Sequence, residues 1–315
     1  MQSALIINRV LPILILLGLG AWCRRTQFVT DQVIDGLKKL AVNMALPAAM
    51  FISFLEVSFE IAYLYVFVAM LAACLVLFGL GFLIRRTFNV SHPYFPFLIT
   101  GFEYGMLGVS LFGSAYGLEK LGYIAVVDLG HEIFIWFIFL AALMVKRDSL
   151  ETPGQLLKVF FRSPVVLGIL SGIGLNVLGA QALMREGLVT GGIMATLRFL
   201  SNLTVPLILL AVGYDIKLDM AGVKEVLPTV AIRLALILPL VFVLSSIVFG
   251  GMLKLAQPFI IATVVLMILP PSFLIPLYIP PEMEEERRYV NNTLILSTVI
   301  SIVMFAVYFV LNPQI

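Results

Sequence analysis

Residues 97–110 read FLITGFEYGMLGVS, an apolar run interrupted by three glycines and by the carboxylate of Glu103. Residues 268–276 read ILPPSFLIP, where the adjacent Pro270 and Pro271 remove consecutive backbone hydrogen bonds from a helix. Broken membrane helices offer end dipoles and free backbone groups near the midplane of a bilayer, which is where membrane carriers hold their ligands. These two stretches therefore predict a pair of interrupted membrane helices with a binding site between them.

A simpler interpretation of the same stretches stays open. Gly101 and Gly105 have the GxxxG spacing of a helix-packing face, and the two prolines can simply end a helix.

The composition of the whole chain is that of a membrane protein. Of its 315 residues, 61% are hydrophobic and 12% are charged, whereas about 25% of the residues in a soluble domain are charged. The net charge of +2 gives no reason to expect a nucleic-acid partner. Two cysteines and two histidines provide neither a disulfide framework nor a metalloenzyme motif. We expect no cofactor, no resident metal and no enzymatic activity.

Ten apolar runs are long enough to cross a bilayer, for which a helix needs about 20 residues. They lie near residues 5–22, 37–55, 61–84, 94–112, 123–145, 163–180, 190–214, 226–250, 257–279 and 290–311. We predict an all-α polytopic membrane protein of ten transmembrane helices. Its first five-helix repeat would span residues 1–145, a cytoplasmic connector residues 146–162, and its second five-helix repeat residues 163–315.

Basic residues gather on one side of the predicted membrane. The connectors after the first, third, fifth, seventh and ninth runs hold 14 of the 20 lysines and arginines, and those on the other side hold only Lys120, Arg185 and Lys254. The positive-inside bias makes the rich side cytoplasmic. We therefore expect a multi-pass protein of the cell membrane with both termini outside.

An odd number of helices per half requires any internal repeat to be inverted. The second and seventh runs share a motif, which reads Lys39-x-x-x-Asn43-x-x-x-Pro47 in one and Arg198-x-x-x-Asn202-x-x-x-Pro206 in the other. Because proline cannot donate to the carbonyl four residues earlier, each proline frees the carbonyl of its asparagine. These groups either line a central cavity or belong to simple kinks whose asparagines are satisfied by neighbouring helices.

Glu103 is the strongest functional candidate, because a charge at the bilayer centre costs at least about 2.5–3.5 kcal/mol and usually faces a cavity. The fifth run adds Asp128, His131 and Glu132 on one helical face, as proton-handling groups or as a polar cluster that holds helices together. Thr293 and Ser297 begin a hydroxyl stripe in the last run, which lines an ion path or bonds its own backbone. Arg233 is a weak candidate for an anion contact that could instead snorkel to the surface.

The order of these motifs resembles that of the auxin efflux carrier family, a relative of the bile acid:sodium symporters. The resemblance rests on Leu11-Pro12 through Gly18 followed by Arg24-Arg25, the Asn43 to Pro47 motif, the glycine-rich fourth run, Arg162-Ser-Pro164-x-x-x-Gly168, Pro206 to Gly213, and Pro270-Pro271 before a Ser/Thr-rich last run. It implies a 5+5 inverted repeat in which helices 1, 2, 6 and 7 form a scaffold. Helices 3–5 and 8–10 would form a transport domain, with broken helices 4 and 9 crossing at the substrate site.

The function that this resemblance implies is secondary active transport by an elevator type of alternating access, moving a small organic anion or carboxylate. The implied substrate-binding residues are Asn43, Pro47, Glu103, Tyr104, Gly105, Asn202, Pro206, Pro270, Pro271 and Ser272. The expected coupling residues are Glu103, Asp128, His131, Glu132, Thr293 and Ser297. The expected partners are a small-molecule substrate, a proton or sodium ion and membrane lipid, with a homodimer as one option.

The chain departs from the family pattern in the fourth run, where Glu103 stands in place of the asparagine that many members have beside the crossover glycine. A permanent carboxylate there would repel an anion. We hypothesise that Glu103 is protonated during transport, which predicts proton coupling, or that it pairs with a cation at a sodium site. The alternatives are a sodium-coupled symporter of the bile-acid type and a membrane sensor that transports nothing.

Overall fold

The computed structural model describes residues 2–56, 62–146, 162–215, 220–280 and 282–314, and this part of the chain is helical without any strand. The predicted all-α class is confirmed. The predicted connector at residues 146–162 lies outside the described residues except at its two ends.

The described part of the first half contains eight α-helices, some of which are continued by short π- or 3₁₀-helical segments, labelled η. In chain order they are α1 (Gln2–Arg25), α2 (Asp31–Leu40), η1 (Ala41–Ala45), α3 (Leu46–Glu56), α4 (Ala62–Thr87), α5 (Phe95–Leu98), η2 (Tyr104–Gly108), α6 (Val109–Tyr116), η3 (Leu118–Lys120), α7 (Leu121–Phe134), η4 (Ile135–Phe139) and α8 (Leu140–Lys146).

The second half is built in the same way. It comprises α10 (Pro164–Val177), α11 (Gln181–Glu186), α12 (Thr190–Asn202), α13 (Thr204–Asp215), α14 (Met220–Phe242), η5 (Val243–Met252), α15 (Gln257–Met267), η6 (Ile275–Tyr278) and α16 (Glu284–Leu311).

Within the described residues, six continuous helical stretches have the length and composition to cross a membrane. They are Asp31–Glu56, Tyr63–Thr87, Leu118–Leu143, Thr190–Tyr214, Gly222–Met252 and Glu284–Leu311. The apolar helices α10 and α15 are shorter. The chain is thus a multi-pass membrane protein by these criteria, and the ten-helix inverted repeat stays a prediction.

Both Asn-x-x-x-Pro motifs coincide with an irregular turn just before the proline. The π-helical segment η1 precedes α3, which has Pro47 in its first turn. At the matching place in the second half the helix is interrupted at Leu203, and Pro206 lies in the first turn of α13. Loss of one backbone N–H donor at each proline accounts for a local irregularity of this kind.

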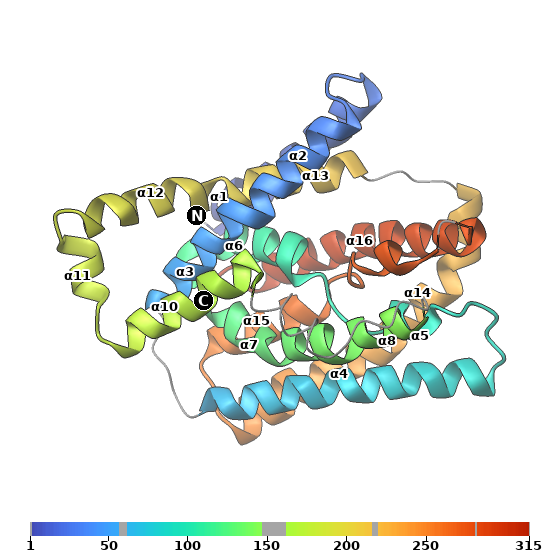
Figure 1. Ribbon diagram of the computed structural model, residues 1–315. Helices are drawn as coiled ribbons and strands as arrows, with labels where there is room; N and C mark the ends of the chain where they lie inside the picture. Colours follow the sequence, from blue (N-terminus) through green and yellow to red (C-terminus); the bar gives the residue numbers. More distant parts are fainter. Residues whose placement is uncertain (1, 57–61, 147–161, 216–219, 281, 315) are drawn as a thin grey trace.

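The helices fall into two groups of close neighbours (Figure 1). In one group α10 runs along α3, α1 runs along α13, and α12 also packs on α3. In the other, α4 and α15 pack on α7, and α14 packs on α16. The groups meet where α6 and α7 lie against α1, α3 and α13.

Small residues allow α10 and α3 to approach with their backbones nearly touching. A methyl group added at Gly168 would run into the backbone of Pro47, and one at Gly172 would run into the backbone of Phe51. Helices in lipid associate through such close packing of small residues four apart. The close packing of α10 therefore fixes the position of α3. Other neighbours of α3 include the broken helix of residues 95–116.

The predicted orientation can be tested by labelling single cysteines with a membrane-impermeant maleimide in right-side-out vesicles. Cys23 and Cys74 are buried and would first be replaced by alanine. Because the basic side is expected to be cytoplasmic, Leu188→Cys should label in intact vesicles, whereas Arg25→Cys and Arg86→Cys should label only after permeabilisation. All three positions are exposed in the structure. The opposite labelling pattern would show that the termini are cytoplasmic.

Candidate functional site

The two interrupted helices predicted from glycine and proline are both broken, and their breaks touch. Helix α5 ends at Leu98, and the chain turns through Gly101 at a φ of +72°, a value that favours glycine. It then continues without regular structure to Glu103, whose backbone N–H donates to the carbonyl of Pro270 at 2.9 Å. Pro270 lies in the second break, between α15 and η6.

The Glu103 carboxylate joins the two breaks. One oxygen, Oε1, accepts from the backbone N–H of Met106 at 3.3 Å, and the other, Oε2, accepts from the backbone N–H of Phe273 at 2.7 Å. The N–H of Met106 lies in η2, and the N–H of Phe273 follows the two prolines of the break between α15 and η6. Glu103 is only 8% exposed. Amide donors of this kind stabilise the ionised form of a carboxyl group.

Arg233 of α14 binds the opposite ends of the same breaks. Its guanidinium donates to the carbonyl oxygens of Leu98, Gly101 and Leu269 at 3.1, 2.8 and 3.0 Å. These carbonyls follow the C-terminal ends of α5 and α15, where the helix dipole is negative. The guanidinium also lies 5.5 Å from the centre of the Phe102 ring. The snorkelling interpretation of Arg233 is wrong, because the side chain is 2% exposed inside the bundle.

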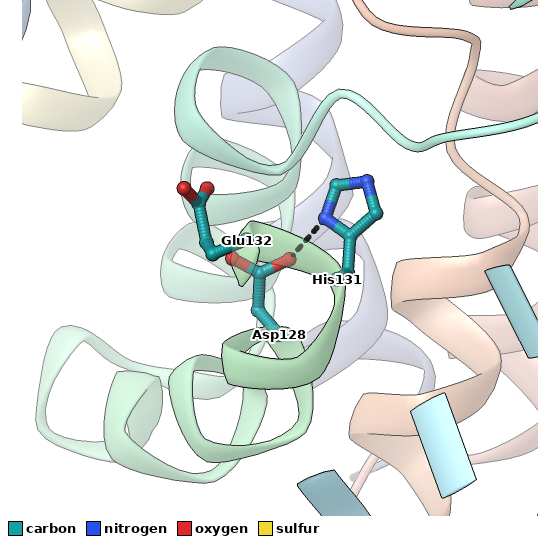
Figure 2. A group of neighbouring side chains, drawn as sticks. All are labelled: Asp128, His131 and Glu132. Carbon is teal, nitrogen blue, oxygen red and sulfur yellow. Dashed lines mark hydrogen bonds and ion pairs between the residues drawn. The ribbon is translucent and has the colours of Figure 1, made fainter. Parts of the chain in front are cut away.

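Asp128 and His131, which are hydrogen-bonded to each other (Figure 2), hold the backbone next to Glu103. The backbone N–H of Phe102 donates to His131 Nε2 at 2.9 Å, and His131 Nδ1 lies 2.8 Å from Asp128 Oδ1. Because Nε2 accepts a hydrogen bond, we infer that the proton sits on Nδ1 and is donated to Asp128. Both side chains are at most 2% exposed. The pair therefore positions the segment that carries Glu103.

Glu132 completes the cluster that the spacing on α7 predicts. Its Oε2 accepts from Trp136 Nε1 at 2.7 Å. The nearest potential ligand atoms of Asp128, His131 and Glu132 all lie within 4.8 Å of one another (Figure 2). Both ring nitrogens of His131 already have partners, so in this arrangement only the two carboxylates could offer oxygen atoms to a cation.

The two breaks, at residues 99–103 and 268–274, touch at a place that we call the crossover. Tyr104 and Gly105 connect this crossover to α3. The Tyr104 hydroxyl lies 3.4 Å from the sulfur of Met50. A methyl group built on Gly105 would lie 3.9 Å from the side chain of Leu46, the neighbour of Pro47 in α3. Of these two contacts between the broken helix and α3, one is apolar and the other is a weak hydrogen bond to sulfur.

The remaining predicted site residues fall into two sets. Pro270, Pro271 and Ser272 are buried in the second break, and Ser272 Oγ accepts from the backbone N–H of Leu274 at 3.3 Å. Asn43 and Asn202 are exposed, and Asn43 Nδ2 donates back to the carbonyl of Lys39 at 2.8 Å. The structure therefore does not bring the two asparagines to Glu103.

The hydroxyl groups of the stripe on α16 also differ in their surroundings. Thr293 is buried and donates to the carbonyl of Tyr289 at 2.9 Å, which is the local alternative that its sequence position left open. Ser297 is buried and lines the same small cavity as Arg233.

Sequence reasoning missed the groups that bind Glu103 and Arg233, because most of them are backbone atoms. The N–H groups of Met106 and Phe273 and the carbonyls of Leu98 and Leu269 have no side-chain signature. The only available signal was an arginine inside an apolar run, which a membrane protein rarely tolerates without a function.

The comparison with protein families matches residues 5–309 to a family described as membrane transport protein. A comparison with curated proteins finds no match.

The Asp128–His131 pair can be tested by a double-mutant cycle on the purified protein. His131→Leu should lower the free energy of unfolding by about 1–3 kcal/mol, because it leaves the buried carboxyl group of Asp128 and the N–H of Phe102 without their partner. Asp128→Asn retains an acceptor for Nδ1–H and should cost only about 1 kcal/mol.

The double variant Asp128→Leu/His131→Leu should lose less than the sum of the two single leucine variants, because neither partner is left behind. Thermal unfolding in detergent measures the wild type, His131→Leu, Asp128→Leu, the double variant and Asp128→Asn. Strictly additive losses would show that the two side chains do not support each other.

Proposed function

This chain belongs to the auxin efflux carrier family of membrane transport proteins, and we propose that it is a proton-coupled secondary transporter of a small carboxylate. The observation that carries the proposal is the buried Glu103 carboxylate, which bridges the two broken helices through the N–H groups of Met106 and Phe273. This carboxylate is the same type of group as the proposed substrate, and it occupies donors that a carboxylate substrate would use.

We propose that transport proceeds by an elevator movement. The scaffold would comprise α1, α2 to α3, α10, and α12 to α13, and the moving domain would comprise α4 to α8 and α14 to α16. The two groups of close neighbours support this division. The contacts of Tyr104 and Gly105 with α3 also support it, because they include one weak hydrogen bond and otherwise apolar groups. Sliding along such a surface breaks few buried hydrogen bonds.

Proton coupling follows from competition at the crossover. While Glu103 is ionised, its charge repels a carboxylate and its oxygens occupy both N–H groups. When Glu103 takes up a proton, the charge disappears and one oxygen becomes a donor, so the side chain is a poorer acceptor. The amide groups of Met106 and Phe273 then become available to the carboxylate of the substrate. One proton would therefore accompany each carboxylate.

A second candidate is sodium coupling through Asp128 and Glu132. It is favoured by one observation, the approach of their carboxylate oxygens within the 4.8 Å cluster on α7. Sodium prefers oxygen ligands, and these two residues would supply them away from Glu103.

The proposal is tested in proteoliposomes with acetate, malate and indole-3-acetate as labelled carboxylates. For the wild type, uptake should rise when the outside is made acidic and should not change when sodium is replaced by N-methyl-D-glucamine. Glu103→Gln removes the titrating group, so the dependence on the pH gradient should disappear. Glu119→Gln is the matched control, because Glu119 is exposed in η3.

Two results would contradict this assignment. Uptake by Glu103→Gln that still follows the pH gradient would exclude Glu103 as the coupling group. Uptake that requires sodium and is lost in Glu132→Gln would favour the second candidate. Thermal unfolding of each variant shows that it is folded before its transport is compared.

A further inference from the structure

A small cavity lies between α14, the end of α15 and α16, next to the crossover. Its polar lining comes from Arg233, Ser297 and Ser301, and its apolar lining includes Ile237, Met267 and Ile300. It has room for about one water-sized particle. A metabolite is therefore too large, and the question is what small species fits these three polar side chains.

Arg233 has no anionic partner in the part of the chain that the structure describes. Its three hydrogen bonds go to backbone carbonyls, and none of the ion pairs found there includes it. Carbonyl dipoles offset part of the charge, but a guanidinium that is 2% exposed is far more stable beside an anion. A guanidinium carries five N–H groups, so two remain for a further partner.

Ser297 gives an independent indication. It is 4% exposed, and its hydroxyl is buried without a hydrogen-bond partner among the described residues. Its neighbours on the same helix behave differently, since Thr293 donates to Tyr289 and Thr298 donates to Leu294 at 2.7 Å. Serines inside helices usually bond to the carbonyl one turn back. Ser297 therefore has an unused buried donor next to the cavity whose lining it shares with Arg233.

We propose that this cavity binds one small inorganic anion of the halide type, chloride in a cell. The anion accepts hydrogen bonds from the free N–H groups of Arg233 and from the hydroxyls of Ser297 and Ser301. A cation is excluded by the guanidinium. A water molecule would satisfy Ser297 but would leave the charge of Arg233 without a counter-ion. Because Arg233 holds carbonyls of both breaks, bound chloride stabilises the crossover without being the transported substrate.

The test uses thermal unfolding of the purified full-length protein at constant sodium concentration, with chloride or bromide replacing gluconate. The wild type should gain a saturable increase in Tm with either halide. Ser297→Ala should raise the half-saturating halide concentration about tenfold, because one hydrogen bond to a charged group is lost. Thr298→Ala is the matched control: its buried hydroxyl is bonded within its own helix, and the halide response should not change.

A second variant keeps the test informative if removal of the hydroxyl alters stability for other reasons. Ser301→Val fills the cavity with methyl groups and should abolish the halide response while leaving the Tm in gluconate within a few degrees of the wild-type value. Equal Tm values in gluconate and chloride would overturn the proposal. A halide response that is linear, or that has the same midpoint in Ser297→Ala, would do so as well. Because no transport is measured, these outcomes are independent of the proposed carrier function.

Discussion

The bilayer core provides no water to satisfy a backbone polar group, and the breaks in two helices of this protein must be stabilised from within. Each break exposes N–H groups at one end and carbonyls at the other, with dipoles of opposite sign. Glu103 accepts from N–H groups on both segments, and Arg233 donates to carbonyls of both. One buried carboxyl group and one buried guanidinium thus satisfy backbone groups at both breaks. Asp128 and His131 add a further support at the N–H of Phe102.

The sequence was sufficient to predict where the helices break but not what stabilises the broken ends. Glycines at 101, 105 and 108 and prolines at 270 and 271 have direct backbone consequences, and both breaks are present. The burial of Arg233 could not be predicted. The apolar run was predicted to start near residue 226, whereas α14 begins at Met220. The longer helix places Arg233 farther from its end, where a side chain cannot easily reach the surface.

For the polar residues too, the sequence predicted local arrangements but not the partners that are distant in the chain. Helical periodicity was enough to bring Asp128, His131 and Glu132 together, since spacings of three and four residues share a helix face. It could not supply Phe102 as a partner, because that contact joins residues 29 positions apart. The Asn-x-x-x-Pro motifs correctly indicated irregular turns. They did not indicate which way each asparagine faces, which depends on the packing of α3 and α13 against their neighbours.

The charges at the crossover also bear on how such a domain could move through the membrane. Carrying one net charge across a potential of 100 mV changes the free energy by about 2.3 kcal/mol. Glu103 and Arg233 carry opposite charges, and a chloride bound at Arg233 would be present in the loaded and in the empty state alike. A proton on Glu103 adds one positive charge, and a bound carboxylate adds one negative charge, so the loaded and empty states carry the same total. Under the proposed competition no net charge is transported, so the membrane potential would neither drive nor oppose net uptake, and the gradients of the proton and of the carboxylate would together set its direction.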